Sequence, residues 1–314
     1  MATYKDIKGT SIEVVSSDPS NPVLGQIWYN TTSQTLKGLE FGAAAWSTGG
    51  ALTTARHALG GAGTQTAGLA IGGLNGTTAT EEYGGTSWTN GGSLTTGLSR
   101  LAAAGTQTAA LAFAGVGDPD GTYSYNGSSW TQLANMGTGR SEGAGCGTQT
   151  AALAIGGNSG STTAATEEWN GSSWTNGGNM GTAREKLAGC GTQTAGLAFG
   201  GQSPPVATEE YDGSSWTNGG NLNTGRYALA GIGLQTAGLA FGGFGPPYST
   251  ATEQYDGSSW TNTSSMSVAR RYLGGAGTQT AGLGFGGYDS STNETTATEE
   301  FTGAGPVTVT LSGS

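Results

Sequence analysis

The sequence predicts an all-β protein built from repeated small sheets, because one segment recurs along the chain with the same strand pattern each time. The segment GTQTAGLAIGG, from Gly63 to Gly73, returns nearly letter for letter. Its copies begin at Gly105, Gly147, Gly191, Gly233 and Gly277, at steps of 42, 42, 44, 42 and 44 residues. Self-similarity at a period of this size is typical of repeat architectures. No segment has the apolar period of a helix.

Composition alone would allow a disordered chain. Of the 314 residues 61 are glycine, and charged residues make up 10%, against about 25% in ordinary globular proteins. All six repeats nevertheless keep an aromatic at one fixed position, and five keep a Trp at a second; a disordered chain does not need regularly spaced aromatics. We therefore expect a folded array, which can form one domain although the length alone suggests two.

Each repeat is predicted to hold four short strands. In the first copy, Ala58 to Gly63 forms the first strand and Thr66 to Ile71 the second. Side chains of the second strand alternate between two faces. Thr78 to Tyr83 forms the third strand, and a tight glycine turn leads into a fourth strand that carries Trp88.

Four strands per repeat, a Gly-Gly doublet after the second strand and aromatics in the third and fourth resemble a blade of the kelch family. The doublets are Gly72-Gly73, Gly156-Gly157, Gly200-Gly201, Gly242-Gly243 and Gly286-Gly287, with Ala114-Gly115 in the second repeat. The third-strand aromatics are Tyr83, Tyr125, Trp169, Tyr211, Tyr255 and Phe301. Five positions later stand Trp88, Trp130, Trp174, Trp216 and Trp260, whereas the sixth repeat has Pro306.

This resemblance covers residues 51–305 and implies a kelch-like β-propeller of four-stranded antiparallel blades. A Gly/Ala-rich sheet of four strands cannot bury enough surface alone, so each blade has to stack on its neighbours. Glycines on one face allow close approach, and Leu and Phe from the other face fill the gap. The Trp is expected to anchor each interface, since a buried Trp hides on the order of 200 Å².

We favour seven blades, because residues 1–50 also contain the pattern of a repeat. Phe41 and Trp46 keep the spacing of the third- and fourth-strand aromatics. Ser11 to Val15 and Gly25 to Asn30 supply two further predicted strands. An N-terminal blade of this kind would precede the six complete repeats.

A rival arrangement has six blades with a shared terminus. In it, the strand of Trp46 closes the blade whose third strand holds Phe301; in the seven-blade arrangement, Gly303 to Thr310 takes that place. The expected organisation is an N-terminal segment with an atypical blade over 1–50, six repeats over 51–305, and a C-terminal strand or tail over 306–314.

The N-terminal stretch carries a second resemblance. Ser17-Asp18-Pro19-Ser20-Asn21-Pro22, followed by Gly25-Gln26-Ile27-Trp28-Tyr29-Asn30-Thr31-Thr32, is similar to a segment near the start of tailed-phage virion proteins, including fibre and appendage components. Together with the Gly/Thr/Ser-rich repeats, the chain resembles kelch-like proteins of marine phages. This likeness implies a structural protein of the virion, with other virion proteins and copies of itself as partners.

Charge and hydropathy exclude other classes of partner. The net charge of -10 and a pI near 4.5 argue against nucleic acid, which requires clustered Lys and Arg. No apolar run approaches the ~20 residues of a membrane span. The first residues, from Met1 to Lys8, lack the apolar core of a signal peptide, so we expect synthesis in the host cytoplasm without classical secretion.

Carboxylates recur in the third strands, as Thr-Glu-Glu-aromatic. The pairs are Glu81-Glu82, Glu167-Glu168, Glu209-Glu210 and Glu299-Glu300, altered to Glu253-Gln254 and to Tyr123-Ser124. Each repeat also offers one Arg near its start: Arg56, Arg100, Arg140, Arg184, Arg226 and Arg270. We expect a repeated Arg–Glu contact that braces loops or blades. A carboxylate ring for Ca²⁺ is disfavoured by the loss of both carboxylates in one repeat, so we expect no metal.

No enzyme motif is present, and we expect neither catalytic residues nor a cofactor. Strand alternation separates the paired carboxylates onto opposite faces, and His57 as the only histidine cannot build a copper site. The stretch Asp212-Gly213-Ser214-Ser215-Trp216 lacks the spacing of a sialidase Asp-box and is predicted as a turn. Cys146 and Cys190 occupy a position that is otherwise Ala or Ile, so both are predicted to be buried free thiols.

The loops between second and third strands differ in every repeat, and up-and-down blades put them on one face with the connections between blades. Divergent loops on a rigid scaffold are a common way to build a recognition surface. The candidate binding residues are Phe244, Tyr248, Tyr288, Asp118, Asp120 and Gln202. We expect this face to bind a host surface glycan or protein; a purely architectural role in capsid or tail is the alternative, and a glycan-processing enzyme or lectin ranks below both.

Overall fold

The computed structural model describes residues 12–74, 76–291 and 293–311, and every regular element in these ranges is a β-strand. The chain divides into two units. One contains 45–302, and the other combines 1–44 with 303–314. The division falls inside the predicted N-terminal segment, between the strand of Phe41 and the strand of Trp46.

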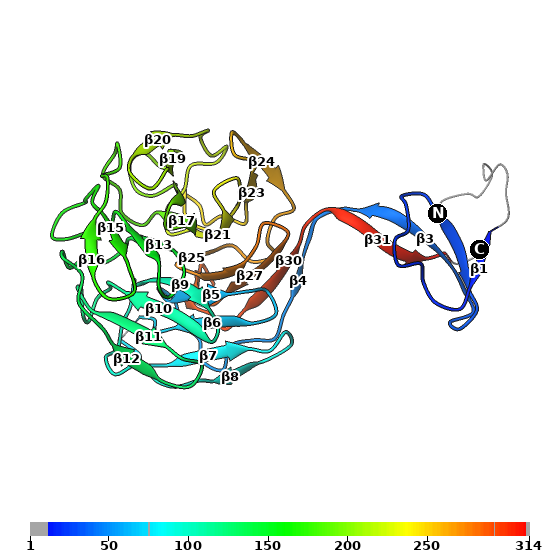
Figure 1. Ribbon diagram of the computed structural model, residues 1–314, viewed down its shortest axis with the longest axis horizontal. Coiled ribbons are helices and arrows are strands. Elements are labelled where there is room, and N and C mark those ends of the chain that lie inside the picture. Colours follow the sequence, from blue (N-terminus) through cyan, green and yellow to red (C-terminus); the bar gives the residue numbers. More distant parts are fainter. Residues whose placement is uncertain (1–11, 75, 292, 312–314) are drawn as a thin grey trace. The chain divides into compact units, whose positions relative to one another are not determined.

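The unit 45–302 is a β-propeller whose sheets radiate from a common centre (Figure 1). Its first blade consists of β5 (Gly60–Gly63), β6 (Gly68–Ile71), β7 (Thr80–Tyr83) and β8 (Trp88–Asn90), all paired antiparallel in chain order. These are the four strands that the repeat pattern predicted, with slightly later starts.

Four further blades repeat this order along the chain. The second has β9 (Ala102–Thr106), β10 (Ala109–Phe113), β11 (Thr122–Tyr125) and β12 (Trp130–Gln132). The third has β13 (Ala144–Gly147), β14 (Ala152–Ile155), β15 (Thr166–Trp169) and β16 (Trp174–Asn176). The fourth has β17 (Ala188–Thr192), β18 (Ala195–Phe199), β19 (Thr208–Tyr211) and β20 (Trp216–Asn218). The fifth has β21 (Ala230–Leu234), β22 (Ala237–Phe241), β23 (Thr252–Tyr255) and β24 (Trp260–Thr263).

The sixth blade joins the two ends of the unit. It consists of β26 (Gly274–Gly277), β27 (Ala281–Phe285), β30 (Thr298–Thr302) and β4 (Ala45–Thr48), with Trp46 opposite Phe301. The innermost strands touch in the cyclic order β5, β9, β13, β17, β21, β26 and back to β5. The ring therefore closes through a strand from its N-terminal side.

The predicted seventh sheet exists, but it lies in the other unit, so the propeller follows the six-blade arrangement with a shared terminus. The side chains of the outermost strand explain the choice. Trp46 donates its indole N–H to Thr252 of the fifth blade at 3.0 Å, as the Trp of every other blade does to its neighbour. The strand of Pro306 offers no such donor.

The second unit is a sheet in the order β1 (Glu13–Val15), β2 (Ile27–Asn30), β3 (Thr35–Gly42) and β31 (Gly305–Thr310). Its first pair is parallel, unlike any pair within a blade. The buried Trp28 donates to Asp18 at 3.0 Å, and Lys37 forms an ion pair with the same carboxylate at 2.7 Å. The strands predicted near both termini are thus present. Ser11 and residues 312–314 lie outside the described ranges.

A glycine is the last or the second-last residue of the first strand in every blade, because the turn there needs a left-handed backbone. Gly63 has φ +100°, and a Cβ on it would lie 2.2 Å from the carbonyl oxygen of Ala67. The five equivalent glycines have φ between +99° and +112°. An L side chain is disfavoured at such a φ, which accounts for the glycine that opens each Gly-Thr-Gln-Thr copy.

A Trp anchors each interface between blades, as predicted. It contributes a hydrogen bond in addition to the apolar surface that it buries. Trp88 packs in a cluster with Phe285 and Leu283 of the preceding blade and donates to Thr298 at 3.0 Å. The other four bonds run from Trp130 to Thr80, Trp174 to Thr122, Trp216 to Thr166 and Trp260 to Thr208.

The glutamine of the repeated segment links blades in a way that sequence patterns did not suggest. Gln149 donates its side-chain amide to the carbonyl oxygens of Ala110 and Tyr125 in the preceding blade, at 3.1 and 2.6 Å. All six equivalent glutamines make this double contact: Gln65, Gln107, Gln149, Gln193, Gln235 and Gln279. The amide bridges two strands of one blade from the next.

Candidate functional site

One residue of each blade forms a ring around one mouth of the central channel. The ring consists of Ala58, Arg100, Glu142, Lys186, Ala228 and Tyr272. Each donates its backbone N–H to the carbonyl oxygen of the equivalent residue in the preceding blade, at 2.7–3.0 Å, so the six hydrogen bonds close on themselves. We call these six residues the mouth ring.

All six mouth-ring residues have a left-handed backbone, with φ between +51° and +58°. For residues other than glycine this conformation is strained, at about 1–3 kcal/mol each. The cyclic hydrogen bonds hold this conformation, and all six residues line the channel at its mouth. Strain of this kind clusters at functional sites, which draws attention to the mouth.

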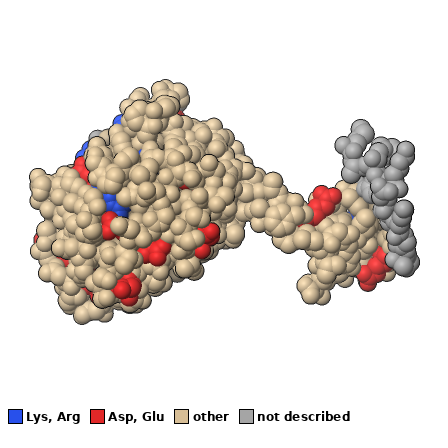
Figure 2. Space-filling view, turned by 90° about the horizontal axis from the view of Figure 1, so that it is seen from above, with Lys and Arg blue, Asp and Glu red and all other residues tan. Residues whose placement is uncertain are grey.

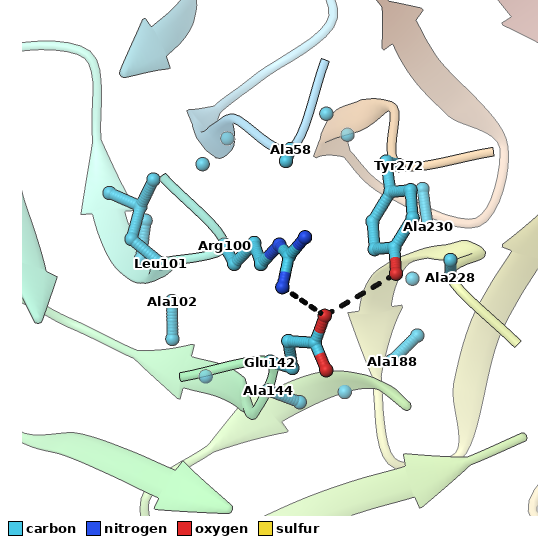
Figure 3. A pocket seen from close by; sticks show the side chains of 18 of the residues that line it. Ala58, Arg100, Leu101, Ala102, Glu142, Ala144, Ala188, Ala228, Ala230 and Tyr272 are labelled. Carbon is cyan, nitrogen blue, oxygen red and sulfur yellow. Dashed lines mark hydrogen bonds and ion pairs between the residues drawn. The ribbon is translucent and has the colours of Figure 1, made fainter. Parts of the chain in front are cut away.

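The side chains of the mouth ring form a polar network (Figure 3). The carboxylate of Glu142 forms an ion pair with Arg100 at 3.1 Å and accepts a hydrogen bond from the Tyr272 hydroxyl at 3.4 Å. Lys186 lies 3.6 Å from the other oxygen of Glu142. Burial, together with the charge of Glu142, raises the pKa of Tyr272 to about 12. The cavity that these side chains line has a volume of about 130 Å³.

Arg100 forms an Arg–Glu contact between blades, as expected, but its partner is Glu142 of the next blade and not a glutamate of a third strand. It lies two residues later in its repeat than the other five arginines and therefore falls in the mouth ring. The equivalent of Arg56 in the second blade is Leu98, which is fully buried and packs in the same apolar cluster as Tyr123. An apolar pair replaces the ionic one there.

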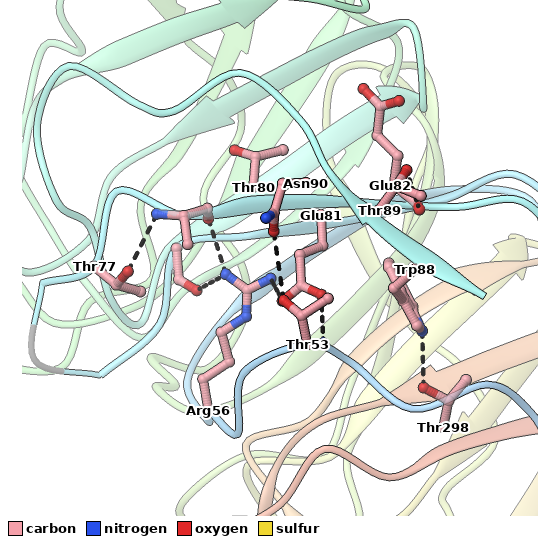
Figure 4. A network of polar contacts seen from close by, with 12 residues as sticks. Thr53, Arg56, Thr77, Thr80, Glu81, Glu82, Trp88, Thr89, Asn90 and Thr298 are labelled. Carbon is pink, nitrogen blue, oxygen red and sulfur yellow. Dashed lines mark hydrogen bonds and ion pairs between the residues drawn. The ribbon is translucent and has the colours of Figure 1, made fainter.

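The other five arginines make the expected contact with the first glutamate of the third strand in their own blade. Arg56 lies 2.9 Å from Glu81, and its second nitrogen donates to the carbonyl oxygens of Gly72 and Ala79 (Figure 4). Glu81 also accepts the backbone N–H of Thr53. The pair thus braces the connection between blades. The equivalent pairs are Arg140–Glu167, Arg184–Glu209, Arg226–Glu253 and Arg270–Glu299.

The second glutamate points to the other face of the strand and contacts the next blade. Tyr125 donates its hydroxyl to Glu82 at 2.6 Å, and burial with this contact raises the pKa of Tyr125 to about 12. Tyr83, Tyr211 and Tyr255 donate likewise to Glu300, Glu168 and Glu210. Within the described ranges, no group of three or more His, Cys, Asp or Glu residues is placed to hold a metal ion.

The mouth of the channel is bordered by the variable loops, because each loop pairs with the opening segment of its own blade. Backbone bridges join Ser99 to Val116, Ser141 to Asn158, and Tyr227 to Phe244. In the sixth blade the same pairing is regular: β25 (Arg270–Arg271), β28 (Tyr288–Asp289) and β29 (Asn293–Glu294) form a small sheet. The loops and the connections between blades therefore share a face, as predicted.

Three of the predicted binding residues, Phe244, Tyr248 and Tyr288, come together on this face. Phe244 and Tyr248 meet edge to face with centroids 5.1 Å apart, and Tyr248 and Tyr288 lie nearly parallel at 6.4 Å. The guanidinium carbon of Arg271 lies beside them, 5.3–5.4 Å from all three centroids and 5.6 Å from that of Tyr272. We call these five residues the aromatic cluster.

Sequence reasoning missed Arg271 and Tyr272. Aligning the residues that follow the repeated arginine would have found them, because these two positions vary from blade to blade, whereas the positions on either side are Arg and Leu in five of the six blades. His57 is the equivalent of Arg271 in the first blade. It packs 5.1 Å from the ring of Tyr288 and pairs with Glu294 at 3.2 Å, and burial lowers its pKa.

The remaining three predicted binding residues lie elsewhere on the loop face. Asp118 accepts a hydrogen bond from the hydroxyl of Tyr123 at 2.5 Å, and Asp120 accepts one from the side-chain amide of Asn135 at 3.0 Å. The side-chain oxygen of Gln202 accepts a hydrogen bond from Lys186 of the mouth ring at 3.0 Å. The two aspartates therefore brace the second blade, whereas Gln202 extends the mouth ring outward.

Two other predictions have structural outcomes. Asp212 accepts the backbone N–H groups of Ser214 and Ser215 at 2.8 Å, which makes its segment a turn and lowers the pKa of Asp212 to about 2. Cys146 and Cys190 are buried free thiols. Burial raises the pKa of Cys146 to about 12, so the thiolate is disfavoured.

Comparison with known proteins supports the fold and goes no further. No family model matches the sequence, and no curated protein sequence matches it. The structure of YjhT, a kelch-like β-propeller, matches with a TM-score of 0.67 over 83% of this chain and 100% of that chain, at 13% identity. The chain is thus a β-propeller repeat protein. No helix among the described residues is long and apolar enough to cross a membrane.

Proposed function

We propose that this protein is a non-enzymatic recognition module that binds its ligand with the loop face of the propeller. The observation that carries the proposal is the distribution of variation. The Trp, Gln and glycine contacts recur in every blade, whereas the mouth ring, the positions next to it and the loops differ from blade to blade. A rigid frame with one diversified face suits binding.

The chemistry of the loop face favours a glycan or protein ligand over a reaction. The aromatic cluster presents several rings on partly exposed loops, and such rings are common anchors of binding surfaces. The carboxylates nearest the mouth are engaged: Glu142 pairs with Arg100 and Lys186, and Glu294 pairs with His57. Neither is a free acid or base beside an open site.

The N-terminal segment suggests where the module works. Its resemblance to the start of tailed-phage virion proteins supports a place on a phage particle, as an appendage or fibre-associated protein. On this proposal the unit formed by 1–44 and 303–314 contacts other virion proteins or copies of this chain, and the propeller contacts a surface molecule of the host. A purely architectural decoration of capsid or tail is the second candidate, favoured if the loop face packs against another subunit.

Binding to host cells tests the proposal. Phe244→Ser, Tyr248→Ser and Tyr288→Ser together should abolish adsorption of the purified protein to intact host cells and leave particle assembly unchanged. The matched control changes loops of the second and third blades, with Val116→Ser and Asn158→Ser, and should bind as the wild type does. Normal adsorption of the triple variant, or failure of assembly with normal adsorption, would favour the architectural role. Cryo-electron microscopy of particles would then show the loop face covered.

A further inference from the structure

The positive charge of Arg271 has no carboxylate partner in the part of the chain that the structure describes. Every other Arg or Lys there forms at least one ion pair. These pairs are Lys37–Asp18, Arg56–Glu81, Arg100–Glu142, Arg140–Glu167, Arg184–Glu209, Lys186–Glu142, Lys186–Glu185, Arg226–Glu253 and Arg270–Glu299. In a protein with a net charge of -10, an unpaired guanidinium is an exception that calls for a reason.

Aromatic rings hold this guanidinium in place. The faces of Phe244, Tyr248, Tyr272 and Tyr288 lie 5.3–5.6 Å from its central carbon, a distance at which cation–π attraction is effective. Its Nε is buried and has no hydrogen-bond partner. The rings fix the position of the group without neutralising its charge, so the site is organised before any ligand arrives.

We infer that the aromatic cluster binds a carboxylate-bearing sugar unit of an acidic polysaccharide. The guanidinium is a planar fork of donors that matches a carboxylate with two parallel hydrogen bonds. The rings of Tyr248 and Tyr288, inclined by 18°, offer flat apolar surfaces beside it for the carbon faces of sugar rings. This inference rests on the proposed function and names the class of ligand at the same face.

The surroundings favour a polymer with spaced charges over a strongly anionic one. Figure 2 shows one side of the propeller unit, on which most of the surface is uncharged and Asp and Glu appear at more places than Lys and Arg. Lys186 and Arg100 at the mouth are compensated by Glu142. A nucleic acid needs many cationic contacts, and this site has one guanidinium without an ion pair. A polysaccharide whose uronate units are separated by neutral sugars needs only one such contact at this site.

Direct binding measurements test the inference. The probe is an oligomer of galacturonic acid, compared by calorimetry with the same oligomer after its carboxyl groups are reduced to alcohols. The wild-type protein should bind the acidic oligomer at least about tenfold more tightly than the reduced one, since a charge-assisted pair is lost. Arg271→Gln should remove that preference. Arg271→Lys keeps the positive charge but loses the planar arrangement of donors, so this variant should retain part of the preference for the acidic oligomer.

Controls separate failure of the inference from failure of the proposed function. Unchanged melting temperatures would show that the Arg271 variants remain folded, and Tyr248→Phe keeps the ring and should retain the preference. Equal binding of both oligomers by wild type and Arg271→Gln would overturn the inference, and so would binding of polyglutamate in place of either oligomer. Loss of host-cell adsorption in the triple aromatic variant would still support the proposed function in both cases. Normal adsorption by that variant would count against both.

Discussion

The second blade lacks polar contacts that most of the other blades have. Comparing it with them separates the contacts that a blade can lose from those that every blade keeps. It has Leu98 and Tyr123 where five blades have a buried Arg–Glu pair, and Ser124 where four blades have a carboxylate facing the next blade. It keeps the double contact of Gln107, the bond from Trp130 to Thr80 and its place in the mouth ring. These contacts are therefore independent of the Arg–Glu pair, since they occur in all six blades.

The comparison also teaches that these substitutions come in matched sets. Where the second carboxylate is present, the next blade has a Tyr, and a glycine directly follows the fourth strand of the blade that holds the carboxylate. A Cβ on Gly91 would lie 2.7 Å from the hydroxyl of Tyr125, so the glycine makes room for that hydroxyl. Both exceptions change all three positions together. They are Ser124, Leu133 and Trp169 in one case and Gln254, Thr263 and Phe301 in the other.

The largest expected effect comes from breaking one partner of an ionic pair in a blade that has it. Arg184→Leu leaves Glu209 buried without its cation, and loss of one partner of a buried pair costs about 3–5 kcal/mol. Chemical denaturation should show this loss in the free energy of unfolding. The double variant Arg184→Leu with Glu209→Phe replaces both partners by apolar groups, as Leu98 and the ring of Tyr123 do in the second blade, and should recover more than half of it. A double variant no better than the single one would contradict the view that the two solutions are interchangeable.

A smaller loss is expected at a contact that all blades share. Gln149→Ala removes both donors from the carbonyl oxygens of Ala110 and Tyr125, which should lower the free energy of unfolding by about 1–3 kcal/mol. Gln107→Ala in the second blade should cost the same, because this contact does not depend on the ionic pair. Thermal unfolding of the two variants side by side measures both. Losses that differ more than twofold would show that the second blade relies on its glutamine differently.

The smallest effect is expected where four of the six interfaces share a contact. Tyr125→Phe removes the hydroxyl that Glu82 accepts and should cost about 1 kcal/mol at neutral pH. The folded-state pKa of Tyr125 is raised to about 12, above its ordinary value near 10. The stability that this tyrosine contributes is therefore complete below about pH 10 and is lost as the pH rises toward 12. Urea titrations across that range should show the wild type converging on the variant.

A complementary exchange sharpens the same comparison. Phe301→Tyr alone adds a hydroxyl against Thr263 and should destabilise the protein. Phe301→Tyr combined with Thr263→Gly and Gln254→Glu completes the matched set and should restore the stability. An equal loss in the single and the triple variant would show that the three positions do not act together.

Much of this molecule follows from local sequence. The period of 42 or 44 residues, the alternation in each strand and the glycine turns determine four-stranded blades, because strand direction and turn geometry depend on neighbours in the chain. The buried Arg–Glu pairs, the buried cysteines and the common face of the loops follow from the same register. The resemblance of Phe41 and Trp46 to a repeat was real, but it did not decide which sheet each strand joins.

Only the tertiary structure decided the closure and the site. β4 pairs with β30, and β3 with β31, and such a choice depends on partners more than 250 residues apart, which no local pattern specifies. Three further features join residues of different blades or loops. They are the hydrogen bonds of the glutamine side chains, the cyclic hydrogen bonds of the mouth ring and the contacts of the aromatic cluster. The sequence by itself determined what each blade is; the ring determined which side chains meet at its mouth.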